Sequence, residues 1–107
     1  MTWDEAAAIA AEWPGVEAGT YHGYPALRVA GKFLTRLGDD GASLEFKGVS
    51  ADERDMLIAA EPALFFAAGG PRSVSVRLAG LDEPTLRGLV EAHWRRVAPK
   101  ALIKARG

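Results

Sequence analysis

The spacing of apolar residues changes several times along this chain of 107 residues. The first apolar residues recur every three or four positions, as on one face of a helix, at Trp3, Ala6, Ile9, Ala10 and Trp13. Thr2 and Glu5 have the spacing of a capping box, in which the two residues satisfy each other's backbone N–H groups. The pattern predicts a helix that begins after the Thr2 cap and ends near Trp13, just before Pro14.

Short segments of alternating apolar and polar residues follow, and they predict strands. These segments are residues 26–29, 33–37, 43–47 and 73–78. The first two flank Gly31-Lys32, which predicts a β-hairpin with a type II′ turn. That turn would place Val29 opposite Leu34, whereas a loop one residue longer would place Val29 opposite Phe33. Because the two registers send opposite side chains to the core, the sequence leaves the hairpin register open.

Two further helices are predicted in the second half of the chain. Ser50 and Glu53 have the spacing of a second capping box, and the helix that follows should end near Ala60. Its predicted inward residues are Met56, Leu57 and Ala60. Asp82 caps a last helix that Pro99 ends. The apolar stripe of that helix consists of Leu86, Leu89, Val90, His93 or Trp94, and Val97.

The predicted order is helix, hairpin, strand, helix, strand and helix, followed by a basic tail over residues 100–107. Short turns between strands favour antiparallel neighbours. We therefore expect an α+β fold, with an antiparallel meander sheet and helices packed on one face, in two layers. A chain of this length forms one domain, here residues 1–107.

The composition narrows the functional classes. The sequence has no Cys, which excludes disulfides, thiolate zinc sites and a cysteine nucleophile, and this composition fits the cytoplasm, where we expect the protein. No apolar run approaches the ~20 residues of a membrane span, so we expect no membrane partner. There is no nucleophile elbow, phosphate-binding glycine loop or pair of His residues at metal-ligand spacing. We therefore predict no catalysis, no metal and no cofactor.

Several segments together have the order and spacing of one known family. They are Pro14-Gly15-Val16-Glu17, Gly23 before Pro25-Ala26-Leu27, Val29-Ala30-Gly31-Lys32-Phe33, Val74-Ser75-Val76-Arg77-Leu78 and Trp94-Arg95-Arg96-Val97-Ala98-Pro99-Lys100. With them the chain resembles the MmcQ/YjbR family of small bacterial proteins, usually labelled DNA-binding. The resemblance implies a sheet packed against helices, similar to the frataxin/CyaY arrangement, and a DNA partner, and it transfers no catalytic residues. The chain departs from many relatives before its last strand, where Gly69-Gly70-Pro71-Arg72-Ser73 replaces an aromatic pair.

Basic residues are the candidate nucleic-acid contacts, because Arg and Lys neutralise phosphates and release counterions. On or beside the hairpin and the last strand they are Arg28, Lys32, Arg36, Arg72 and Arg77, and at the end of the last helix they are Arg95, Arg96 and Lys100. A purely structural interpretation is that strand cations oppose edge-to-edge aggregation and helix-end cations complement the helix dipole. Tyr24, which lies among turn residues, is the candidate for stacking on a base.

The 13 basic and 14 acidic side chains nearly cancel, so polyanion binding requires that folding gathers cations on one surface. From the resemblance and the charges together we predict weak, salt-sensitive DNA binding through the phosphate backbone, with little base specificity. The alternative is a module that binds a protein or a small ligand on the exposed face of the sheet.

Overall fold

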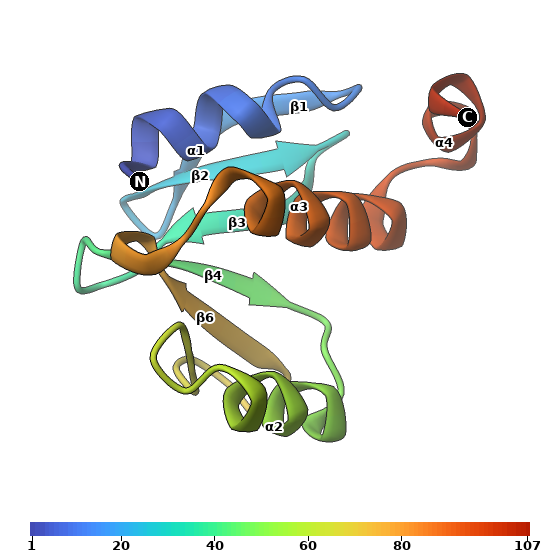
Figure 1. Cartoon of the computed structure of the whole chain (residues 1–107). Helices are drawn as coiled ribbons and strands as arrows, with labels where there is room; N and C mark the ends of the chain where they lie inside the picture. Colours follow the sequence, from blue (N-terminus) through green and yellow to red (C-terminus); the bar gives the residue numbers. More distant parts are fainter.

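The computed structural model describes residues 1–107, and a six-stranded antiparallel sheet forms one of its layers (Figure 1). In spatial order the strands are β1 (Val16–Tyr21), β2 (Tyr24–Val29), β3 (Lys32–Leu37), β4 (Ser43–Lys47), β6 (Ser73–Arg77) and β5 (Phe65–Phe66). The helices are α1 (Trp3–Ala10), α2 (Ala51–Ala60), α3 (Glu83–Val97) and α4 (Lys100–Arg106), with a 3₁₀ turn at Leu78–Gly80. The predicted α+β fold, an antiparallel sheet with helices packed against it, is confirmed. None of the helices has the length and apolar character needed to cross a membrane.

The helices begin where the sequence predicts their caps. Thr2 and Glu5 form the capping box of α1, and the predicted caps of α2 and α3 each accept a hydrogen bond from a backbone N–H in the first turn. α1 is shorter than predicted, because it ends at Ala10 and the chain then turns, although Trp13 beyond it is still buried. Residues 100–106, predicted as a tail, form α4.

α2 is oriented differently from the prediction. Met56 is 66% exposed and Ala60 is also exposed, so the predicted inward positions are wrong for these two residues. The helix packs through Leu57 and Ile58, and its neighbour in the sheet is the short strand β5 at the edge. A helix at a sheet edge has little surface to cover, which leaves its remaining side chains in solvent.

Two tight turns set the register of the first three strands. His22-Gly23 joins β1 to β2 and Ala30-Gly31 joins β2 to β3, with φ angles of 50° and 84° in the first turn and 49° and 82° in the second. Positive φ at both central residues defines a type I′ turn, whose twist matches that of the strands. Val29 therefore pairs with Lys32, and both registers considered from the sequence are wrong. The reason is that Ala30, which is not glycine, adopts the left-handed conformation.

A β-bulge in β3 decides which side chains reach each face of the sheet. Thr35 and Phe33 pair with successive residues of β2, so Leu34 between them has no partner there. An extra residue of this kind shifts the alternation of side chains along its strand. Leu34 is buried in the core, whereas Phe33 and Arg36, three positions apart, both contact residues on the opposite face.

The core lies between the sheet and helices α1 and α3 (Figure 1). Its main buried residues are Leu27, Val29, Leu34, Leu44, Phe46, Val74, Val76, Leu86, Val90 and Trp94. Full burial of each large apolar side chain stabilises the fold by about 1.5–3 kcal/mol. The indole N–H of Trp94 donates to the carbonyl oxygen of Pro14 at 2.8 Å, so this fully buried ring leaves no polar group unsatisfied.

Candidate functional site

A recess of about 770 Å³ lies on the face of the sheet that points away from the core. We call this face the open face; its strand residues include Glu17, Tyr21, Tyr24, Arg28, Phe33, Arg36, Ser43, Glu45, Lys47, Ser73, Ser75 and Arg77. The recess is lined by Tyr21, His22, Tyr24, Arg36, Asp39, Glu45, Lys47, Gly48, Gly69, Gly70, Pro71, Arg72 and Ser73. Charged groups and two tyrosine rings dominate this lining, which suits a polar ligand that also offers a flat apolar surface.

Gly69 brings the backbone of one wall close to the floor of the recess. Its φ is 80°, and a Cβ atom at this position would clash with Oε2 of Glu45. Glycine is therefore required here both for its conformation and for the close approach of the backbone. Glu45 is only 4% exposed beneath this wall.

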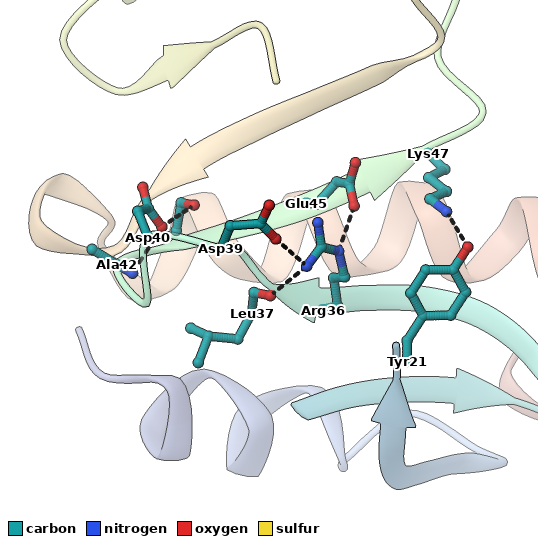
Figure 2. A network of polar contacts seen from close by, with 9 residues as sticks. Tyr21, Arg36, Leu37, Asp39, Asp40, Ala42, Glu45 and Lys47 are labelled. Carbon is teal, nitrogen blue, oxygen red and sulfur yellow. Dashed lines mark hydrogen bonds and ion pairs between the residues drawn. The ribbon is translucent and has the colours of Figure 1, made fainter. Parts of the chain in front are cut away.

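Arg36 holds the acidic end of the recess (Figure 2). Its Nε donates to Glu45 Oε1 at 2.7 Å and its Nη1 donates to Asp39 Oδ1 at 2.9 Å. Burial alone would lower the pKa of Arg36, but the hydrogen bonds to Glu45 and Asp39 outweigh it and raise that pKa above its ordinary value. The guanidinium also lies 4.9 Å from the centre of the Tyr24 ring. Arg36 is thus an ion-paired side chain that fixes the positions of Glu45 and Asp39 in the recess.

Lys47 supplies the positive end of the recess (Figure 2). Its Nζ donates to the hydroxyl of Tyr21 at 2.8 Å and lies 4.3 Å from the centre of that ring and 4.5 Å from the centre of Phe33. No carboxylate pairs with it. Aromatic rings attract an ammonium without neutralising it. Lys47 therefore presents an unpaired, partly buried cation to the recess.

The sequence interpretation missed Lys47 as a site residue, and it did not foresee the contact of Lys47 with Tyr21. The signal for Lys47 was present, because Glu45 and Lys47 alternate with the core residues Leu44 and Phe46. The contact with Tyr21 crosses the two intervening strands β2 and β3 and has a sequence separation of 26, so no local pattern predicts it.

A family model named YjbR matches residues 11–96 of the chain, which include every residue that lines the recess. The chain belongs to the YjbR family. No curated protein and no solved structure matches it significantly. In this YjbR-family protein the matched region runs from the end of α1 into the last turns of α3, and α4 lies outside it.

On the open face of the YjbR domain, further predicted cations also lack a carboxylate partner. Arg72 is exposed and lines the recess. Arg28 donates to the carbonyl oxygen of Thr20 at 3.1 Å, and Arg77 lies 4.4 Å from the centre of the Phe66 ring. Lys32 is exposed beside the second turn, but it pairs with the core residue Val29 and therefore lies on the opposite face of the sheet. Arg28, Lys47, Arg72 and Arg77 are thus open-face cations without a carboxylate ion-pair partner, although Glu17 lies opposite Arg28 in the sheet.

The C-terminal cations of the YjbR domain are arranged differently. Arg95 pairs with Glu91, and Arg96 Nη2 lies 3.0 Å from both carboxylate oxygens of Glu53. Both arginines belong to α3, which packs on the core side of the sheet, although Arg96 also donates to the carbonyl oxygen of Gly48 at the rim of the recess. Lys100 begins α4 and is exposed. The structure therefore does not gather the two predicted groups of cations on one surface.

His93 lies directly beneath the recess on the core side. Its ring stacks on Phe46 with the centres 4.6 Å apart, and the side chain is buried. Burial and the nearby charge of Arg96 lower the pKa of His93 to about 4, although Glu53 and a hydrogen bond with the backbone of Lys47 oppose this shift. His93 is therefore a neutral core residue at pH 7, and it supports the strand that carries Lys47.

Proposed function

We propose that this YjbR-family protein binds nucleic acid weakly through the phosphate backbone, using the open face of its sheet. One observation carries the proposal. The open face holds the unpaired cations Arg28, Lys47, Arg72 and Arg77, whereas each arginine of α3 is paired with a carboxylate. Unpaired cations are free to replace the counterions of a polyanion, which is the main source of nonspecific affinity.

The salt dependence of binding tests this proposal. Engagement of these cations predicts a slope of log K against log salt of about −3 to −4, and a Kd on the order of 10⁻⁴–10⁻⁶ M at physiological salt. Substitution of both Arg72 and Arg77 by glutamine should make the slope of log K against log salt shallower by about 2 units. Fluorescence anisotropy with a labelled oligonucleotide over a salt series measures both quantities.

The matched control is the double substitution of Arg95 and Arg96 by glutamine. It removes the same formal charge, but from side chains that are already paired with Glu91 and Glu53. We expect the slope to stay within experimental error of the unchanged protein. A larger loss in this control than in the variant lacking Arg72 and Arg77 would refute the open face as the binding surface.

The recess itself favours a second candidate function, the binding of a small polar ligand without nucleic acid. Its volume of about 770 Å³ lies within the range of small-molecule sites. Under this alternative, oligonucleotides would show no saturable binding even at 20 mM salt.

A further inference from the structure

We infer that the recess accepts one unpaired nucleotide, so that the protein prefers single-stranded to double-stranded nucleic acid; this inference rests on the proposed nucleic-acid function. A positively charged face alone would follow phosphates on either kind of strand. The recess adds a concave site with aromatic walls, which a paired and stacked base cannot enter.

The two ends of the recess differ in charge, and this difference orients a nucleotide. Lys47 and Arg72 lie at one end without carboxylate partners, whereas Asp39 and Glu45 lie at the other end with Arg36. A phosphate is attracted to the first end and repelled from the second. The sugar-phosphate backbone should therefore pass over Lys47 and Arg72, with the base directed toward Arg36.

Tyr24 and Arg36 form a platform for that base. The guanidinium carbon of Arg36 lies 4.9 Å from the centre of the Tyr24 ring, and its hydrogen bonds to Glu45 and Asp39 fix its position. Unpaired bases stack on aromatic rings and on guanidinium planes, and this stacking is largely independent of sequence. In a duplex both faces of each base are already stacked, so the platform has nothing to bind.

The size and construction of the recess agree with this occupant. A volume of about 770 Å³ is sufficient for a nucleotide, and it is open to solvent at the sheet surface, so the strand on each side of the bound nucleotide can continue outward. Gly69 keeps the wall over Glu45 free of side chains. The bound nucleotide would thus meet fixed backbone on one side and charged side chains on the other.

The experiment compares three labelled ligands of equal length with the full-length protein by fluorescence anisotropy at 50 mM salt. They are a single-stranded 12-mer, its blunt duplex, and a single-stranded 12-mer with abasic sites at every position. We expect the single strand to bind roughly 5-fold or more tightly than either of the others, since stacking of one base is worth at least that factor. Equal affinity for all three would overturn the inference and leave the proposed function standing, whereas no binding of any ligand would overturn both.

Substitutions of Tyr24 in the platform and of the cation Lys47 then locate the site. Tyr24→Leu should abolish the preference for the single strand over the abasic strand, and Tyr24→Phe, which keeps the ring, should retain it. Lys47→Met should weaken all three ligands, whereas Lys104→Met, which removes another unpaired lysine on α4, should not. A preference that survives Tyr24→Leu in a folded variant would place the unpaired base elsewhere and overturn the assignment.

A competition experiment separates a strand from a free nucleotide, which has the same base and phosphate chemistry. A nucleoside monophosphate should displace the labelled 12-mer only at concentrations far above the Kd of the strand, because it lacks the flanking phosphates. Displacement at an equal or lower concentration would show that the recess is a nucleotide site, and the single-strand inference would be wrong.

Discussion

The removal of Arg36 gives the sharpest test of how the floor of the recess is held together. One guanidinium binds two carboxylates whose surroundings differ strongly. The Asp39 side chain is 74% exposed, whereas the Glu45 side chain is 6% exposed and that of Arg36 is 15% exposed. The substitution Arg36→Met keeps an unbranched chain and removes the charge.

The expected magnitude follows from the burial of Glu45. Removal of one partner from a buried ion pair leaves an uncompensated charge and costs about 3–5 kcal/mol. An exposed pair such as Arg36 with Asp39 is worth about 0–1 kcal/mol, so Asp39→Asn should have a small effect. With an unfolding entropy of about 2.1 cal/mol/K per residue over 107 residues, the cost of Arg36→Met corresponds to a fall in Tm of roughly 13–22 °C.

Urea denaturation and differential scanning calorimetry measure these quantities on Arg36→Met, on Asp39→Asn and on the double variant Arg36→Met, Glu45→Met. The double variant has no buried charge, and we expect it to regain most of the stability lost in Arg36→Met. The reasoning is refuted if Arg36→Met costs less than about 1 kcal/mol, or if the double variant is no more stable than Arg36→Met.

Three further predictions concern conformation and titration. Burial holds the pKa of His93 at about 4 against 6.5 in the unfolded chain, so the free energy of unfolding should fall by about 3 kcal/mol as the pH drops from 6.5 to 4. In urea titrations His93→Gln should lack this pH dependence. The same pH dependence in both proteins would contradict the prediction. Ala30→Asn places a residue that tolerates positive φ before Gly31 and should stabilise the protein by about 0.5–1 kcal/mol, read as a higher Tm. Gly69→Ala should lower the free energy of unfolding by at least about 1–2 kcal/mol in thermal denaturation. Gly70→Ala, with no atom near the added methyl group, should change it by less than about 0.5 kcal/mol. Similar losses in both variants would disprove the close approach of the Gly69 backbone to Glu45.

Much of the fold could be predicted from local signals. The capping residues and the helical spacing of apolar positions specified α1, α2 and α3, because caps and periodicity act within a few residues. β1 was not predicted as a strand, because four of its six residues are exposed and its side chains show no alternation. The face of α2 was wrong at Met56, since the sequence does not reveal that this helix lies at a sheet edge.

The site was only partly predictable. Open-face cations such as Arg72 and Arg77 were named from their residue type and their place beside the last strand. Whether each cation is paired depends on contacts between distant segments, as in the pair of Arg96 with Glu53, 43 residues away. The bulge at Leu34, which turns Phe33 toward Lys47, has no signature in a sequence that is read as simple alternation.

The two type I′ turns also bear on the order in which the recess forms during folding. Along the β1–β2 and β2–β3 ladders the most distant partners are Val16 and Val29, so this meander closes only short loops, at a small entropic cost. β4 extends this local meander, since its Glu45 and Leu44 pair with Arg36 and Leu37 of β3. β6, in contrast, joins at long range, because its Ser73 pairs with Lys47 across α2 and β5. The tyrosine rings and Lys47 thus belong to an early, local unit, while Arg72 and the wall at Gly69 arrive with the long-range pairing of β6. A partly folded chain would carry the rings and Lys47 without Arg72 or the opposite wall of the recess, so full binding would require the completely folded protein.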